Sequence, residues 1–365
     1  MSSDVVLVIV VATALVFDFT NGFHDTANVV ATSISTHAMP PRIAVAYAAL
    51  LNFVGAFISL AVAATVAKDV VDSDVITTTV VFAGLVGAII WNLATWYFGL
   101  PSSSSHALIG GVVGAAFAAS GSAAVESAGL VGKVLIPAVL APIVAFIAGV
   151  IAINLVYGIV GRERPGLVNR GFRLGQVLSG GMLALAHGTN DAQKTMGVIT
   201  LALVANGSLS SDADVPFWVV VSAASAIALG TYFGGWRIIR TMGTRIIKMD
   251  AAQGFSAQGA GAAVILASSH YGFPLSTTQV ISGGVMGAGA GKQVSAVRWG
   301  VAGNIVVAWL LTLPAAAAMG AVTYGFCNLF GNVAAGPIMV CLFGLAALAV
   351  FFSRRLREEP LPAGG

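Results

Sequence analysis

The sequence predicts an all-α polytopic membrane protein with two inverted repeats of about five membrane segments each, paired re-entrant hairpins, and one extra C-terminal segment. Three observations lead to this fold class. Of the 365 residues, 58% are hydrophobic and 8% are charged, whereas soluble domains carry about 25% charged residues. Uncharged runs of the ~20 residues needed to span the hydrocarbon core follow one another along the chain. Two polar motifs each occur twice in the same order, which indicates a duplicated chain.

The apolar runs are separated by charges, prolines and glycine clusters. We expect membrane segments near 5–36, 43–67, 75–98, 104–120, 131–160, 174–204, 215–236, 255–271, 277–290, 296–325 and 335–352. The ranges 104–120 and 277–290 are short for full spans, which favours re-entrant hairpins. We assign residues 1–160 to the first repeat, 161–173 to a cytoplasmic linker and 174–325 to the second repeat. Residues 326–365 are assigned to an extra transmembrane segment with a cytoplasmic tail.

Basic residues are distributed unevenly between alternate loops. With the N-terminus outside, the inside loops hold Arg42, Arg162, Arg164, Arg170, Arg173, Arg237, Arg240, Arg245, Lys248, Lys292, Arg298, Arg354, Arg355 and Arg357. The outside loops hold only Lys68 and Lys133, among several acidic residues. This positive-inside bias predicts a multi-pass protein of the cell membrane with its N-terminus outside and its C-terminus inside.

One polar block begins at Gly99 as GLPSSSSHALIGGVVGAA, and a near-copy begins at Gly272 as GFPLSTTQVISGGVMGAG, at an offset of 173 residues. Upstream, NGFHDTAN matches HGTNDAQK, which sets Asp25 against Asp191 at an offset of 166 residues. Each half contains an odd number of apolar segments, so the two copies would sit in opposite orientations. Inverted repeats with interrupted helices are typical of secondary transporters, whose binding sites lie at the repeat interface.

Each polar block has the pattern of a helix N-terminus buried in the membrane. Pro suits the first turn of a helix, and Ser hydroxyls cap its free N–H groups. Two such N-termini, with their positive dipole ends, would form a site for an oxyanion near the midplane. The candidate oxyanion-binding residues are Ser102, Ser103, Ser104, Ser105, Ser276, Thr277, Thr278, Asn28 and Asn190. The competing interpretation is that the small residues only allow helices to pack closely.

Acidic side chains within apolar segments are rare and usually functional. Asp25 and Asp191 occupy such positions in the two motif copies. A carboxylate repels an oxyanion, so a site that holds both also needs a cation: a proton, sodium or a divalent metal. The candidate cation-coupling residues are Asp25, Asp191, Asn21 and Asp18. Asp25 and Asp191 are also candidate metal ligands. Alternatively, Lys194 pairs with Asp191 as a structural ion pair. His24 and His187 either relay protons or form structural hydrogen bonds.

These motifs resemble those of the inorganic phosphate transporter (PiT) family, from roughly Asp4 to Phe352. The first signature has His24 where many members have Asn, and the second keeps the Asn-Asp pair that ends in Asp191. The resemblance implies phosphate uptake, an inverted-repeat fold with two hairpins, and a homodimer. The form NGFHD is similar to that of bacterial low-affinity members, which implies uptake with protons or as a neutral divalent metal–phosphate complex. Sodium-coupled relatives tend to have Glu at the positions of Asn52 and Gln258.

The favoured hypothesis is a cation-coupled symporter that imports inorganic phosphate with protons, assisted by Mg²⁺ or Ca²⁺, across the lipid bilayer. Sodium coupling, or another tetrahedral anion such as sulfate, stays open as an alternative. The least favoured hypothesis is an intramembrane hydrolase that uses a serine with His106, or a metal bound by His24, Asp25 and His187. His106 becomes Gln279 in the second copy, and the spacing fits no triad or metal site. We therefore expect no enzyme, no covalently bound cofactor and no nucleic-acid partner.

Overall fold

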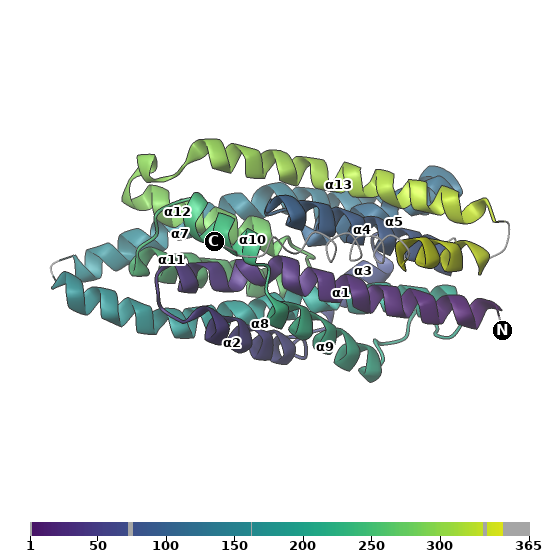
Figure 1. Cartoon of the computed structure of the whole chain (residues 1–365), viewed down its shortest axis with the longest axis horizontal. Helices are drawn as coiled ribbons and strands as arrows, with labels where there is room; N and C mark the ends of the chain where they lie inside the picture. Colours follow the sequence, from purple (N-terminus) through teal and green to yellow (C-terminus); the bar gives the residue numbers. More distant parts are fainter. Residues whose placement is uncertain (1, 72–75, 162, 331–333, 346–365) are drawn as a thin grey trace, which may run out of the picture.

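The chain folds into a bundle of long helices that run side by side along one direction (Figure 1). The computed structural model describes residues 2–71, 76–161, 163–330 and 334–345. Within these residues, five helices are long and apolar enough to cross a membrane. A sixth span exists if the pair Phe217–Phe233 and Trp236–Arg245, bent by 60°, counts as one. The prediction of an all-helical, multi-pass membrane protein is confirmed at this level.

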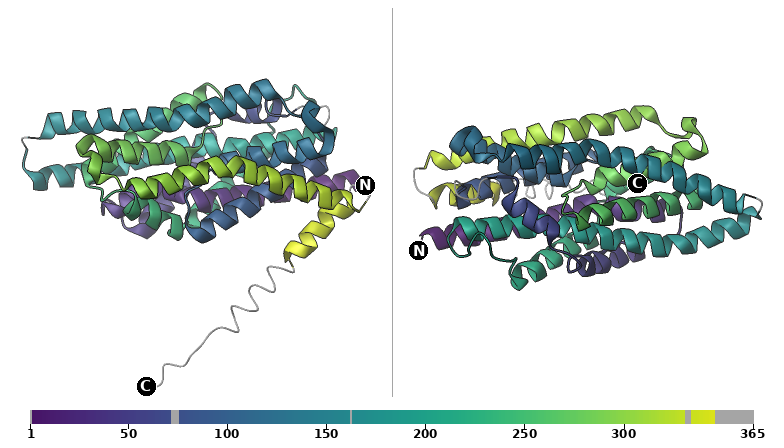
Figure 2. Two further views of the ribbon diagram at one scale, coloured as in Figure 1. Left: turned by 90° about the horizontal axis from the view of Figure 1, so that it is seen from above. Right: turned by 180° about the vertical axis from the view of Figure 1, so that it is seen from behind.

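The helices of the first half are α1 (Ser2–Ser35), α2 (Pro41–Gly55), α3 (Ala61–Lys68), α4 (Thr78–Phe98), α5 (Ser104–Ser120), α6 (Ser127–Gly129) and α7 (Ile136–Val160). Those that follow are α8 (Pro165–Ala205), α9 (Phe217–Phe233), α10 (Trp236–Arg240), α11 (Ala251–His270), α12 (Thr277–Lys292) and α13 (Trp299–Asn328). A further apolar helix covers Ala335–Leu345. The start of α1 and the end of α13 lie at the same end of the bundle in every view (Figure 2).

The predicted segment 43–67 is wrong as a single helix, because the chain breaks between α2 and α3. The side-chain oxygen of Gln193 in α8 accepts hydrogen bonds from the backbone N–H groups of Val62 and Ala63 at 2.9 and 3.2 Å. These are first-turn N–H groups, which have no partner inside their own helix. A side chain distant in sequence therefore allows a new helix to begin inside the apolar region.

Part of the predicted linker is helical, and part of the last predicted segment lies outside the described residues. Helix α8 begins at Pro165, inside the range 161–173 that we assigned to a linker, so part of that linker is helical. The last predicted segment, 335–352, is described only as far as Leu345, and the basic residues of the tail lie outside the described residues. The boundaries of the repeats stay predictions.

The helices that carry the Asp motifs pack closely against partners from the other half of the chain. Helix α1 packs against α9, and α8 packs against α2. Each contact is made at the motif glycine. A Cβ atom on Gly22 would lie 2.3 Å from the carbonyl oxygen of Ile227, and one on Gly188 would lie 2.1 Å from that of Asn52. Glycine is therefore required at both positions because a neighbouring backbone occupies the space of a side chain.

The helices that follow the polar blocks also pack against helices from the other half of the chain. Helix α5 packs against α13, and α12 packs against α7. A Cβ atom on Gly114 would lie 2.1 Å from the oxygen of Ala317, and one on Gly287 would lie 2.0 Å from that of Phe146. The two glycines are related by the same offset of 173 residues as the polar blocks.

We expect Gly188→Ala to destabilise the protein, because the added methyl group would overlap the backbone of α2. Overpacking of this kind costs about 1–3 kcal/mol. Gly259→Ala in α11 is the matched control, since no atom lies within 4 Å of the position of its Cβ. Thermal unfolding in detergent measures both variants. Equal melting temperatures would contradict the close contact between α2 and α8.

Candidate functional site

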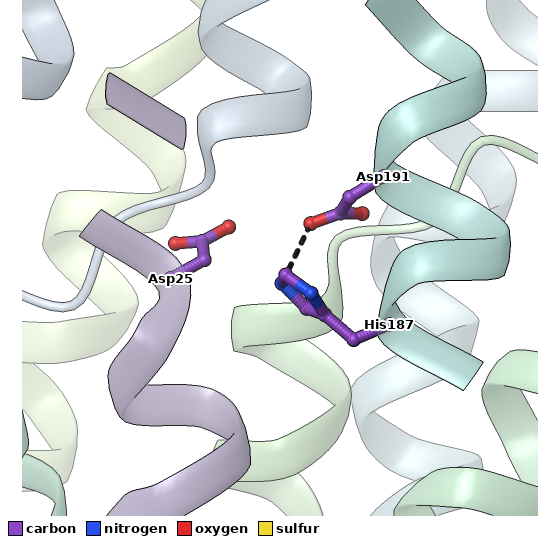
Figure 3. A group of neighbouring side chains, drawn as sticks. All are labelled: Asp25, His187 and Asp191. Carbon is purple, nitrogen blue, oxygen red and sulfur yellow. Dashed lines mark ion pairs between the residues drawn. The ribbon is translucent and has the colours of Figure 1, made fainter. Parts of the chain in front are cut away.

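The two motif carboxylates face each other in the interior of the bundle. Asp25 projects from α1 and Asp191 from α8, with His187 one turn before Asp191 on the same helix (Figure 3). All three side chains are buried. Each offers one ligand atom, and these atoms lie within 4.8 Å of one another. The structure therefore brings together two residues that the sequence placed 166 positions apart.

Both polar blocks form buried helix N-termini, as predicted. Helix α5 begins at Ser104, and the Ser103 hydroxyl accepts a hydrogen bond from the backbone N–H of His106 at 3.1 Å. Helix α12 begins at Thr277, and Ser276 caps it in the same way through Gln279 at 3.3 Å. The other first-turn N–H groups have no acceptor within their own helices. Ser103 and Ser276 thus fix the two helix ends.

The carboxylate of Asp25 accepts hydrogen bonds from both helix N-termini. Ser104 of α5 donates to Oδ2 at 2.6 Å, and Thr278 of α12 donates to Oδ1 at 3.3 Å. Nδ1 of His24 lies 2.7 Å from Oδ1. Asp25 therefore connects α1 to the tips of the two polar blocks.

Asp191 is bound by a cation as well as by a hydroxyl. The Lys194 ammonium contacts Oδ1, while Thr277 donates to Oδ2 at 3.0 Å and Nε2 of His187 lies 3.1 Å from Oδ2. Lys194 also donates to the Ser105 hydroxyl and, at 2.7 Å, to the carbonyl oxygen of Leu275. The structural pairing of Lys194 with Asp191 is present, and the same ammonium holds the two block tips together.

Asn28 and Ser105 complete the contacts between the elements. The amide of Asn28 donates to Thr278 at 2.9 Å and to Thr277 at 3.4 Å, which joins α1 to α12. Ser105 donates to the carbonyl oxygen of Leu275 at 3.1 Å, which joins the two blocks directly. We call Asp25, Asn28, Ser104, Ser105, Asp191, Lys194, Thr277 and Thr278 the central cluster.

Besides the capping residues Ser103 and Ser276, four predicted site residues lie outside the central cluster. Ser102 donates to Thr95 at 2.8 Å. Asn190 donates to the hydroxyl of Ser269 at 2.8 Å, at the end of α11. The remaining two, Asn21 and Asp18, precede Asp25 on α1 and lie beside each other.

Three polar residues that were not predicted as site residues contact the histidines of the site or one another: Thr95, Asn52 and Thr231. Nε2 of His24 lies 3.1 Å from the hydroxyl of Thr95 on α4. Nδ1 of His187 lies 3.3 Å from the side-chain oxygen of Asn52, whose amide donates to Thr231 at 2.8 Å. Thr95 and Thr231 belong to no repeated motif, and Asn52 is singled out only by the family resemblance. The sequence therefore contains no pattern that would have placed these three residues.

The central cluster combines donors for an anion with acceptors for a cation. Hydroxyls, an amide and free helix N–H groups converge on the position that two carboxylates also face. Ser102, His24 and Asp25 follow one another as hydroxyl, imidazole and carboxylate, the order of a hydrolytic triad. The Ser102 hydroxyl lies 3.4 Å from Nε2 of His24, however, and donates to Thr95. The arrangement favours binding of ions over nucleophilic attack.

Comparison with known proteins identifies transporters as relatives over almost the entire chain. The model of the "Phosphate transporter family" matches residues 21–167 and again residues 161–320. The chain belongs to the phosphate transporter family. Membership in this family of transporters excludes the hydrolase hypothesis.

Several relatives in the phosphate transporter family are highly similar. A "probable low-affinity inorganic phosphate transporter" of Mycobacterium bovis is 54% identical, over 97% of this chain and 85% of the relative. A protein with the same description from Bacillus subtilis is 44% identical, over 89% of this chain and 98% of the relative. A solved structure described as "the sodium-dependent phosphate transporter" superposes with a TM-score of 0.82. It is 23% identical in sequence and covers 89% of this chain and 99% of its own. At this identity the structure supports the fold alone.

Proposed function

We propose that this protein is a cation-coupled symporter that imports inorganic phosphate, with protons as the coupling cation and with Mg²⁺ or Ca²⁺ accompanying the substrate. The observation that carries the proposal is the central cluster, where the N-termini of α5 and α12 meet the carboxylates of Asp25 and Asp191. Low-affinity phosphate transporters are among the similar proteins. Sulfate would suit the same donors, and the family relationship favours phosphate over it.

On the anion side, we assign the main contacts to Ser104, Thr277, Thr278 and Asn28, together with the first-turn N–H groups of α5 and α12. A buried helix N-terminus binds phosphate oxygens through its N–H groups and its dipole. Ser103 and Ser276 act by capping these helices. Ser102 and Asn190 hold the surrounding elements in place, and Ser105 joins the two tips.

On the cation side, we assign Asp25 and Asp191, with His187 as a third ligand when a divalent ion accompanies phosphate. Their ligand atoms lie within 4.8 Å of one another, close enough for one ion to contact all three. Lys194 uses Oδ1 of Asp191, so the ion would bind Oδ2 in place of the hydrogen bond from Thr277. A divalent ion here would reduce the repulsion between the carboxylates and the phosphate.

The neutral amides near the site support protons over sodium. The side-chain nitrogen of Gln258 donates to Thr32 and Ser33 at 2.6 and 2.7 Å. The side-chain nitrogen of Asn52 donates to Thr231. Both amides are thus used for hydrogen bonds within the protein, and neither position provides a carboxylate for a sodium ion.

We further propose that the two halves are inverted repeats with paired hairpins. Equivalent positions support this: Gly99 and Gly272, both with positive φ (66° and 74°), precede the two blocks. The exchanged pairings of α1 with α9 and α8 with α2 fit two interlocked copies. The homodimer and the orientation with the N-terminus outside are proposals from the family resemblance and the charge distribution.

Uptake of labelled phosphate into proteoliposomes tests the proposed function. At a fixed membrane potential, we expect an inward proton gradient to drive accumulation, Mg²⁺ or Ca²⁺ to increase it, and replacement of sodium by choline to leave it unchanged. Sulfate in excess should compete weakly. A strict requirement for sodium, with no response to the pH gradient, would overturn the assignment of the coupling ion.

We expect the double variant Thr277→Val/Thr278→Val to bind phosphate more weakly, because the substitutions keep side-chain volume but remove two hydroxyl donors. Loss of donors to a buried charged ligand costs about 1–3 kcal/mol each, so the dissociation constant should rise at least ~25-fold. Thr200→Val is the control, since the Thr200 hydroxyl donates within its own helix, to the carbonyl oxygen of Met196. Unchanged binding in the double variant, measured by calorimetry in detergent, would remove α12 from the anion site.

A further inference from the structure

Three acidic side chains are fully buried in α1 and α8, and only two of them are compensated. Asp25 and Asp191 each contact an imidazole and accept at least one hydrogen bond from a hydroxyl. Asp191 also contacts an ammonium group. Asp18 is 0% exposed. Among the described residues, neither oxygen of its carboxylate accepts a hydrogen bond of normal geometry, and the only polar side chains that act on it as donors are those of Thr195 and Asn21. Asp18 therefore needs a different explanation from the other two.

The groups beside Asp18 are polar atoms that also have no hydrogen bond. The Thr195 hydroxyl and the Asn21 side chain are the polar neighbours that act on its carboxylate. Within the described part of the chain, Oγ1 of Thr195 and Oδ1 of Asn21 have no hydrogen-bond partner, and both residues are buried. Three neighbouring side chains with unused polar atoms, all inside the protein, indicate a site for a small ligand.

This site is separate from the central cluster. Asp18 precedes Asp25 by seven residues on α1, about 10 Å along a helix, and Thr195 follows Asp191 by one turn on α8. Asp18 thus lies toward the N-terminal end of α1, and the apolar core there includes Ala14, Phe17 and Val198. The charged groups among the described residues that act on Asp18 are Asp191 and Lys194, which have opposite signs and contact each other.

An ionised Asp18 can accept from the Thr195 hydroxyl and the Asn21 amide, but among the described residues its charge then has no cation of its own, and Oδ1 of Asn21 has no donor. A protonated Asp18 has a partner for both of its oxygens and for Oδ1 of Asn21. The O–H of the acid can donate to Oδ1 of Asn21, and its other oxygen can accept from the Thr195 hydroxyl. Every unused oxygen of the three side chains is then part of a hydrogen bond, as buried polar groups require. A buried charge without such compensation is strongly disfavoured.

We propose that Asp18, with Asn21 and Thr195, is a proton-binding site distinct from the phosphate site. The bound proton comes from water and converts the carboxylate to a carboxylic acid. The inference rests on the proposed function in one respect: this proton is one of those that move with phosphate.

Infrared spectroscopy of the purified protein tests the site without any transport measurement. A protonated carboxylic acid has a C=O stretching band that ionised carboxylates lack. We expect the wild-type protein at neutral pH to show such a band and Asp18→Asn to lose it. Asp250→Asn is the matched control and should keep it. Burial alone would raise the pKa of Asp250, but the N–H of Gln253 and contacts with Lys292 and Tyr157 hold this pKa below its usual value. Asp250 is therefore ionised and adds nothing to the band.

A second variant keeps the test valid if Asp18→Asn does not fold. Thr195→Val removes one hydrogen bond to the acid at nearly constant volume, so the band should shift in frequency without disappearing. Replacing choline by sodium should leave the wild-type band unchanged. An unaltered spectrum in both variants overturns the proposal. Loss of the wild-type band on addition of sodium also overturns it, because the site would then bind a metal ion.

The transport measurement separates this inference from the proposed function. In proteoliposomes, Asp18→Asn should lower the number of protons taken up per phosphate by about one relative to wild type, with the phosphate dissociation constant changed less than ~3-fold. An unchanged proton-to-phosphate ratio rejects Asp18 as a coupling site. Failure of the wild-type protein to transport phosphate at all would reject the proposed function and leave the infrared result standing.

Discussion

The Asp25→Asn variant should bind phosphate but fail to accumulate it against a gradient. Asn keeps the size of the side chain and an oxygen that can accept from Ser104 or Thr278, so the tips of α5 and α12 stay in place. The substitution removes the charge that attracts a cation to the anion site. We expect concentrative uptake to fall to simple equilibration, while the phosphate dissociation constant changes less than about tenfold, or ~1.4 kcal/mol.

Uptake of labelled phosphate into vesicles, with and without an imposed proton gradient, measures this effect. Asp69→Asn provides the control, because Asp69 forms a partly exposed pair with Lys133 at 2.6 Å and takes no part in the central cluster. Accumulation by the Asp25→Asn protein at the wild-type level would show that the coupling cation does not depend on this carboxylate.

Lys194→Met should be the most destabilising of the substitutions considered for this protein. The Lys194 ammonium is buried and contacts Asp191, Ser105 and the carbonyl oxygen of Leu275. Its removal leaves the Asp191 charge without its cation, and breaking a buried pair in this way costs about 3–5 kcal/mol. Thermal or denaturant unfolding in detergent measures the loss.

The chain contains a matched control for this variant. Lys292 also pairs with an aspartate, Asp250, at 2.9 Å, but the two side chains are 51% and 38% exposed. Pairs of this kind contribute about 0–1 kcal/mol, so Lys292→Met should unfold almost as wild type does. Adding Asp191→Asn to Lys194→Met should restore part of the stability, since no uncompensated charge then remains. A Lys194→Met protein as stable as the Lys292→Met protein would contradict the buried pair.

The centre of the site could be predicted from the sequence because its signals are local and repeated. Asp25 and Asp191 are acidic residues in apolar segments, and the two Pro–Ser blocks show the pattern of capped helices. Duplication at nearly equal offsets predicted that the two blocks would meet, and the hydrogen bonds of Ser104, Thr277 and Thr278 add the two carboxylates to the same place.

Other features could not be predicted, because they depend on contacts between distant residues. The break after Gly55 has no proline or charge near it and depends on a side chain of α8, Gln193, that caps α3. Lys194 was identified as a partner of Asp191 from its spacing of three residues, but its contact with Leu275 depends on how α8 meets the second block. Asn190 looked equivalent to the other polar residues of the motif, yet its amide faces the end of α11.

The hydroxyls of Ser104, Thr277 and Thr278 each carry a single hydrogen, and each one is donated to a carboxylate. A hydroxyl that turns to an incoming anion must leave Asp25 or Asp191 short of a donor. A cation can then replace what the carboxylate has lost, so each ion raises the affinity for the other by the same factor. Phosphate titrations at two cation concentrations, and cation titrations at two phosphate concentrations, should therefore give one shared coupling free energy. We therefore expect Asp25 and Asp191 of the empty carrier, which are bound by its own hydroxyls, to have little affinity for a cation in the absence of phosphate.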